Sequence, residues 1–209
     1  MRRFFDMENP LWQGLSVAAD MMLLNLLTLF CCIPVLTMGA AFTALNDVVI
    51  RLFRQEEGAI LRSYGRAFRQ NLKKGGLFGL LLLAAALLLY FDWLCALTYA
   101  PVFRYGIAAI AVLLLAWSIY TFALLARYEN SLPAAMKNAA MLAVGYFPRT
   151  LGMLCFCVAF WLIGIRYYRI GAPVLFLFGF SLPCYVSILL MRRMFERLES
   201  GKENGGIEE

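Results

Sequence analysis

Polar side chains inside long apolar segments are the first residues of this chain that could do chemistry. Asp20 and Asn25 lie in the first apolar segment, and Asn46 and Asp47 lie in the next one. Such side chains are costly among apolar neighbours and often mark ion or proton pathways. If the chain turns near Leu36, Asn25 comes level with Asn46 and Asp47. We expect a polar cluster, which either binds an ion or proton or joins two helices by hydrogen bonds.

A row of basic side chains forms a second candidate site. The row consists of Arg62, Arg66, Arg69 and Lys73. The opposite face of the same predicted helix, residues 60–73, is apolar: Ile60, Leu61, Tyr64, Phe68 and Leu72. This pattern is typical of an amphipathic helix at a membrane surface. The basic row either docks an acidic partner or only contacts anionic headgroups and fixes the topology.

Other residue types that carry chemistry are absent or unsuitably placed. The chain contains no histidine, which removes most nucleophilic triads, most zinc sites and the commonest general base. All six cysteines fall inside apolar segments: Cys31, Cys32, Cys95, Cys155, Cys157 and Cys184. Cys155 and Cys157 stand two apart and so point in different directions on a helix. We expect no catalytic residue, no metal site and no cofactor, and cysteines that pack as small apolar residues.

The composition is that of an integral membrane protein. Hydrophobic residues make up 63% of the chain and charged residues 15%, against about 45–50% and about 25% in an ordinary globular domain. A crossing helix needs about 20 apolar residues. The sequence predicts an all-α, polytopic helical bundle within residues 1–195 and a disordered polar tail over residues 196–209. The expected spans are residues 17–35, 39–53, 76–98, 105–126, 149–165 and 171–191.

Three helix hairpins joined by two cytoplasmic amphipathic helices would connect these spans. Pro34 and Gly39 divide the first hairpin, because proline removes a backbone hydrogen bond and glycine permits a turn. Residues 39–53 either span the membrane or are re-entrant and only partly spanning, and the alternative is five crossings with the N-terminus outside. The second amphipathic helix is expected to begin after Ser131, with Pro133 in its first turn. Gly75 and Gly79 form a small-residue pair that permits close helix approach.

The distribution of positive charge predicts the orientation. Of the 19 lysine and arginine residues, only Arg104, Arg166 and Arg169 fall in the short turns. Positive charge stays on the cytoplasmic side, so the long loops and both termini should be cytoplasmic. We expect no cleaved signal peptide, because Asp6 and Asp20 interrupt the pattern that such a peptide needs. The basic balance indicates membrane orientation and no nucleic-acid partner.

Four stretches of the chain are similar to a known family. They are residues 7–10 (Met-Glu-Asn-Pro), 25–39 (from Asn-Leu-Leu to Cys-Cys-Ile-Pro-Val-Leu-Thr-Met-Gly), 54–58 (Arg-Gln-Glu-Glu-Gly) and 68–74 (Phe-Arg-Gln-Asn-Leu-Lys-Lys). With them the chain resembles the YesL-like family of bacterial integral membrane proteins, a domain family of unknown function. The resemblance covers about residues 5–197 and implies no catalytic or binding residue.

The resemblance also suggests a biological setting. Members of the YesL-like family are often encoded beside carbohydrate uptake and polysaccharide-degradation systems, including binding-protein-dependent sugar permeases. We therefore expect a non-enzymatic protein of the bacterial cytoplasmic membrane, accessory to a carbohydrate transport system. Its partners would be the lipid bilayer and sugar-transporter subunits, and its oligomeric state stays open. The alternative is a small transporter or channel that uses the polar cluster.

Overall fold

The computed structural model describes residues 10–54, 59–99, 102–128 and 131–192, and these ranges hold helices and turns but no strand. The elements are α1 (Pro10–Cys31), the short 3-10 helix η2 (Val35–Thr37), α2 (Met38–Phe53), α3 (Ile60–Tyr99), α4 (Phe103–Arg127), α5 (Leu132–Gly145), α6 (Phe147–Arg166) and α7 (Tyr168–Phe178). A last helix, Ser181–Arg192, follows α7. The predicted all-helical class is confirmed. The expected tail, residues 196–209, lies outside the described residues.

Several of these helices are long and apolar enough to cross a membrane. Within the described ranges five segments qualify: Gly14–Cys31, Val35–Phe53, Ile60–Leu97, Phe103–Arg127 and Phe147–Arg166. The pair Gly171–Phe178 and Ser181–Arg192 makes a sixth if its two helices, which meet at a 60° bend, count as one span. The chain is a multi-pass membrane protein by the length and composition of its helices.

The first turn lies where the sequence predicts it. α1 ends at Cys31, before Pro34, and α2 begins at Met38 after the short helix η2. The Thr37 hydroxyl donates to the carbonyl oxygens of Cys31, at 2.7 Å, and of Pro34, at 2.8 Å. The last carbonyl groups of a helix have no hydrogen-bond partner within the helix. The Thr37 side chain supplies a partner to one of them at the end of α1.

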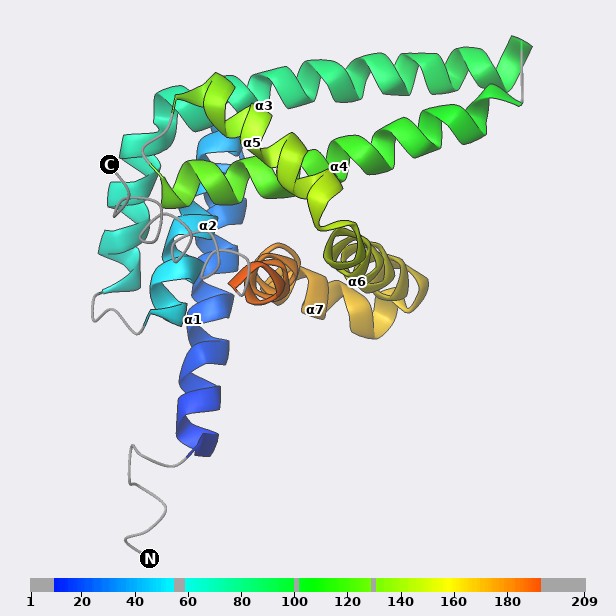
Figure 1. Cartoon of the computed structure of the whole chain (residues 1–209). Helices are drawn as coiled ribbons and strands as arrows, with labels where there is room; N and C mark the ends of the chain where they lie inside the picture. Colours follow the sequence, from blue (N-terminus) through cyan, green and yellow to red (C-terminus); the bar gives the residue numbers. More distant parts are fainter. Residues whose placement is uncertain (1–9, 55–58, 100–101, 129–130, 193–209) are drawn as a thin grey trace, which may run out of the picture.

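The predicted surface helix and the span after it form one helix in the structure. α3 runs for 40 residues without interruption, so the separate helix expected over residues 60–73 and the span expected over residues 76–98 are continuous. Figure 1 shows that the first turns of α3 nevertheless stand at a marked angle to its longer remainder. A Gly75–Gly76 pair lies inside the helix, and glycine pairs are a common cause of helix bends.

The α2 and α3 backbones approach each other through small residues. A Cβ built on Gly39 would stand 2.6 Å from the Cα of Gly79, and one built on Gly75 would stand 2.7 Å from the Thr43 hydroxyl. Gly39 could not carry a side chain without moving the helices apart, because the atoms in its way are backbone atoms. The pair Gly75 and Gly79 therefore serves close helix approach, as the sequence predicts.

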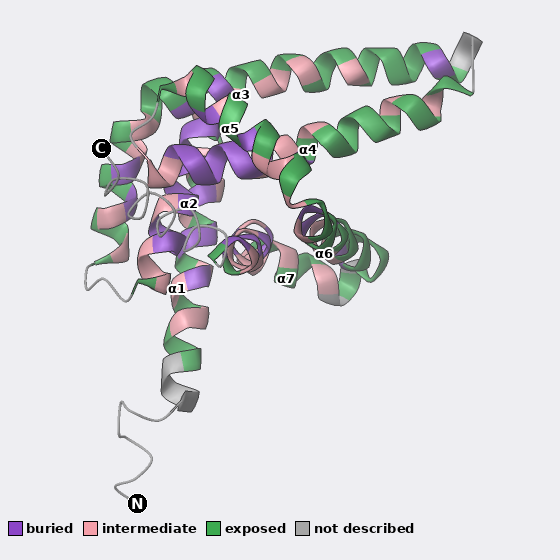
Figure 2. Ribbon diagram, in the orientation of Figure 1, coloured by how far each residue is buried: buried purple, intermediate pink, exposed green. Residues whose placement is uncertain are grey.

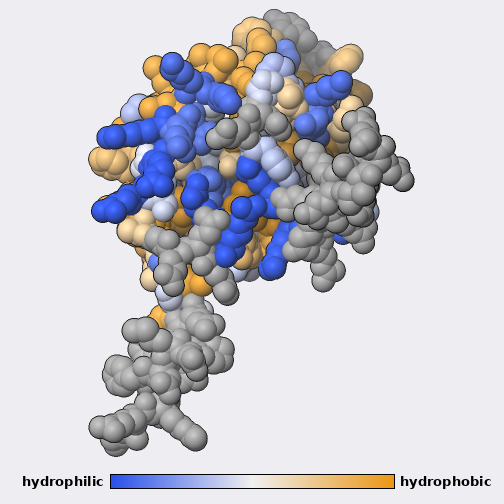
Figure 3. Space-filling model, turned by 60° about the vertical axis from the view of Figure 1, so that its left-hand side comes forward, coloured by the Kyte–Doolittle hydropathy of each residue, from blue (hydrophilic) through white to orange (hydrophobic). Residues whose placement is uncertain are grey.

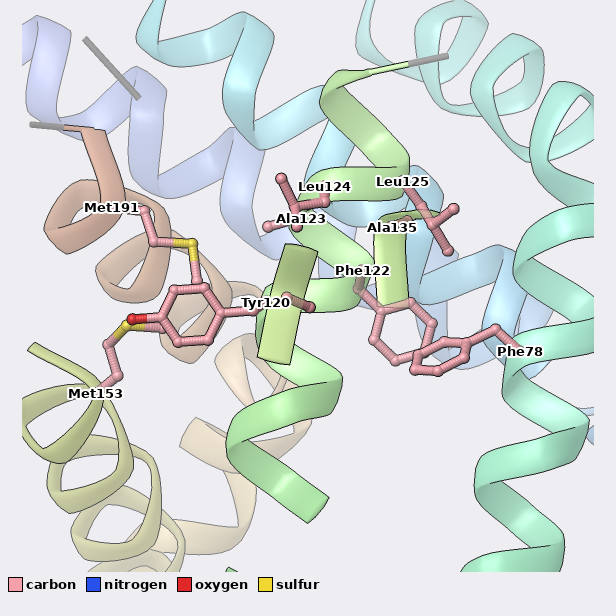
Figure 4. Close-up of a cluster of buried hydrophobic side chains, with 10 residues drawn as sticks. Phe78, Tyr120, Phe122, Ala123, Leu124, Leu125, Ala135, Met153 and Met191 are labelled. Carbon is pink, nitrogen blue, oxygen red and sulfur yellow. The ribbon is translucent and has the colours of Figure 1, made fainter. Parts of the chain in front are cut away.

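An aromatic and methionine core joins the other helices. Phe78 of α3 packs edge-on against Phe122 of α4, with ring centroids 5.0 Å apart. Figure 4 shows Tyr120 between the side chains of Met153 and Met191, which come from α6 and the last helix. The Tyr120 hydroxyl shares a 2.9 Å hydrogen bond with that of Thr150. Buried residues gather where α2, α4 and α5 meet, as Figure 2 shows.

The helices run in several directions, and the expected arrangement of three hairpins stays a prediction. α3 and α4 form a long antiparallel hairpin whose far half is mostly exposed, whereas α6 is seen end-on in the same view (Figures 1 and 2). The expected span over residues 171–191 is two helices, because the chain bends by 60° between Phe178 and Ser181. α5 packs on α4, where Ala135 and Ala139 are fully buried and the Trp117 indole N–H donates to the Met136 carbonyl at 2.9 Å.

Candidate functional site

Asn25 connects α1 to the bend near the end of the chain. Its amide nitrogen donates to the Phe176 carbonyl at 2.7 Å, and its amide oxygen accepts from the backbone N–H groups of Phe180, at 2.8 Å, and Ser181, at 3.2 Å. The last carbonyls of one helix and the first N–H groups of the next have no intrahelical partners. Asn25 supplies a hydrogen-bond partner to one such carbonyl and to two such N–H groups, and its side chain is fully buried. These contacts give Asn25 a structural role.

The other three residues of the expected polar cluster have different surroundings. The Asn46 amide donates to the Phe42 carbonyl of its own helix at 2.8 Å. Asp47 accepts from the Arg51 guanidinium at 3.0 Å, one turn further along α2. Asp20 lies half-buried in the interior of α1. Asn25 therefore bonds to the last two helices, whereas Asn46 and Asp47 each make a hydrogen bond within α2.

The basic row of α3 is exposed, while the opposite face of the same turns is packed inside the protein. Arg62, Arg66, Arg69 and Lys73 are all exposed. Tyr64 and Ala67, by contrast, are each 2% exposed and belong to a core with α1 and α2. Figure 3 shows hydrophilic side chains gathered on the side of the molecule where α3 begins.

Buried hydrogen bonds hold this part of α3 in place. The Tyr64 hydroxyl lies 3.4 Å from the Thr28 hydroxyl of α1 and 3.3 Å from the Ala41 carbonyl of α2. The Tyr64 ring also stacks beside that of Phe68. The orientation of the basic row is therefore fixed by contacts on the other side of the helix. Two residues of the predicted apolar face, Leu61 and Leu72, remain exposed.

A cavity of about 590 Å³ lies between α2, α3, α4, α6 and the last helix. Its volume is within the range of about 300–1,000 Å³ that is usual for ligand pockets. Aliphatic and aromatic side chains dominate its lining, and none of the lining residues is charged. Sequence reasoning missed this cavity, because its walls come from five helices that are distant in sequence.

The polar side chains of the cavity are few, and two of them donate hydrogen bonds within the protein. They include Asn46, Ser118 and Ser187. The Ser118 hydroxyl donates to the Leu115 carbonyl at 2.8 Å. Asn46 donates to Phe42, as described above. In the described part of the chain, no three His, Cys, Asp or Glu side chains gather where they could hold a metal ion.

Comparison with known proteins finds that part of this chain is similar to an uncharacterised family. Residues 21–93 match the family described as "Protein of unknown function, DUF624". Neither the curated proteins nor the solved structures contain a match to the chain. The matched segment covers the second half of α1, all of α2 and most of α3. It therefore contains Asn25, the close contact between α2 and α3, and the basic row, but not the helices that complete the cavity.

Proposed function

We propose that this chain is a non-enzymatic accessory protein of a carbohydrate transport system in the bacterial cytoplasmic membrane. Its termini and long loops would be cytoplasmic. The basic row of α3 would dock an acidic surface of a transporter subunit of the binding-protein-dependent kind. The observation that supports this proposal is the division of α3 between an exposed basic row and a packed face, where Tyr64 and Ala67 are each 2% exposed.

The packed face favours a protein partner over a lipid surface. An amphipathic helix binds a membrane by burying its apolar face at the headgroup boundary. In α3 most of that face packs on α1 and α2, which leaves less of it for lipid. Basic side chains that project from a packed helix suit a complementary acidic surface. Such contacts are screened over about 8 Å at physiological salt, so this docking should be salt-sensitive.

The cavity supports an accessory role over transport of sugar by this chain itself. A sugar offers many hydroxyl groups, and each buried one needs a hydrogen-bond partner. The lining is mostly apolar, and Asn46 and Ser118 already donate to carbonyl groups of their own helices. The carbohydrate setting itself comes from the resemblance to the YesL-like family.

The alternative, a small transporter or channel, has one observation in its favour. Asn46 belongs to the expected polar cluster and also lines the cavity. If that cavity carries a substrate or ion, reconstituted protein should show a flux that Asn46→Leu abolishes. Flux in the wild-type protein and none in the variant would favour this alternative over the accessory role.

Co-purification from native membranes tests the accessory role. We expect a sugar-permease subunit to copurify with the wild-type chain and to be lost when Arg62 and Arg69 are both changed to glutamate. Lys137→Glu, at an exposed position of α5, is the control for a change of charge alone. Retention of the permease subunit by the double variant, or its absence from the wild-type sample, would contradict the proposal.

A further inference from the structure

The cavity has the chemistry of a site for a hydrocarbon chain. Its walls are aliphatic and aromatic, with no charged residue among those that line it. Water needs two to four polar partners in a buried site, and the polar groups here are few. An empty apolar space leaves the atoms around it without contact partners on one side. An apolar occupant would restore those contacts.

The rim of the cavity indicates where such an occupant would come from. Leu115 of α4 is 40% exposed, and Val158 and Leu162 of α6 are 41% and 61% exposed. Ala86 of α3 is also exposed, and all four residues line the cavity. Each belongs to a helix that is long and apolar enough to cross the membrane. The rim is therefore made of side chains suited to the hydrocarbon layer of the bilayer.

We propose that this cavity binds a linear acyl chain that enters sideways from the bilayer. The chain would lie against the aromatic and aliphatic walls supplied by α2, α3, α4, α6 and the last helix. Because the lining offers few polar side chains, and Asn46 and Ser118 already donate to carbonyl groups of their own helices, the bound segment needs no polar group. This proposal is independent of the accessory role, since it involves neither the basic row nor a protein partner.

Photolabelling of the purified full chain tests the proposal. The probes are phosphatidylethanolamine and palmitic acid, each with a photoreactive diazirine in its acyl chain. We expect labelling that saturates, that unlabelled lipid competes away, and that maps to the cavity segments around Leu115 and Val158. The probe that saturates at the lower concentration shows whether the bound chain is esterified. Labelling that rises without saturation, or that spreads evenly over the exposed surface, would overturn the proposal.

A matched pair of variants separates the cavity from the rest of the surface. Ala86 lines the cavity, whereas Ala84 is exposed on the same helix and does not. We expect Ala86→Trp to lower saturable labelling at least fivefold and Ala84→Trp to leave it unchanged. Equal labelling of the two tryptophan variants would overturn the proposal. The saturation measurement on wild-type protein decides the matter if a variant does not fold.

Discussion

Gly39 of α2 lies against Gly79 of α3 so closely that a methyl group on Gly39 would stand 2.6 Å from the Gly79 Cα. The atoms in the way are backbone atoms, which cannot move aside as a flexible side chain can. The whole helix would have to shift instead. The contact joins α2 to α3, which carries the basic row, and both helices contribute to the walls of the cavity.

The glycine contact predicts that the effect of a glycine-to-alanine substitution on stability depends strongly on its position. Gly39→Ala should lower the free energy of unfolding by about 1–3 kcal/mol, the usual cost of overpacking. Gly106→Ala is the control, since a Cβ at Gly106 meets nothing within 4 Å. It should change stability by no more than about 0.5 kcal/mol. Thermal unfolding in detergent measures both, and equal melting temperatures would argue against the close contact.

Asn25 predicts a local effect far away in the sequence. Asn25→Leu removes three hydrogen bonds to Phe176, Phe180 and Ser181. A buried polar group left without a partner costs about 1–3 kcal/mol. We expect faster hydrogen exchange around the bend between α7 and the last helix, with little change in α5. Asn138→Leu, at an exposed site of α5, should leave exchange at the bend unchanged. Unaltered exchange in Asn25→Leu would contradict the assigned contacts.

Asp47 distinguishes an ion pathway from a structural pair. Its carboxylate accepts from Arg51 one turn away, and pairs of this spacing contribute only about 0.3–0.5 kcal/mol. Asp47→Asn should therefore insert and fold with a small loss of stability. The rate of ion or proton flux in proteoliposomes should not differ between the wild type and the variant. A flux that is present in the wild type and disappears in Asp47→Asn would assign the residue to transport instead.

The orientation of the chain can be tested at exposed, described positions. In a variant without native cysteines, Gly65→Cys and Ser131→Cys should resist an impermeant thiol reagent in intact cells. Gly106→Cys, near the far end of the α3–α4 hairpin, should react. The expectation follows from the basic residues that flank the first two positions. Labelling of Gly65→Cys in intact cells would show that the orientation is the opposite of the predicted one.

Local sequence patterns predicted the local parts of this fold. Pro34 and Gly39 placed the first turn, Ser131 placed the start of α5, and Gly75 with Gly79 indicated close helix approach. Each depends on the preferences of a few adjacent residues or on one helical period. The sequence did not predict that α3 is continuous. A basic segment followed by an apolar one indicates a boundary between two environments, but a single hydrogen-bonded helix crosses that boundary.

Partners distant in sequence could not be predicted from the same patterns. Asn25 contacts a bend more than 150 residues away, and the shared depth of Asn25, Asn46 and Asp47 in one hairpin gives no sign of that contact. The cavity depends on five helices and on a 60° bend after Phe178. The apolar composition of residues 171–191 predicts a membrane segment, but not its direction. The exposed basic row, by contrast, follows from helical spacing alone.

The central claim, that the basic row of α3 docks a transporter subunit, is tested most directly by cross-linking in living cells. A photoreactive amino acid would replace Arg66 in the middle of the row. The control position is Leu113 of α4, which is 68% exposed on the far part of the long hairpin. Position 66 should cross-link to a sugar-permease subunit in cells, and isolated membranes irradiated at about 1 M salt, where screening acts within about 3 Å, should give less of the product. Position 113 should not give that product. A permease cross-link from position 113 and none from position 66 would contradict the account.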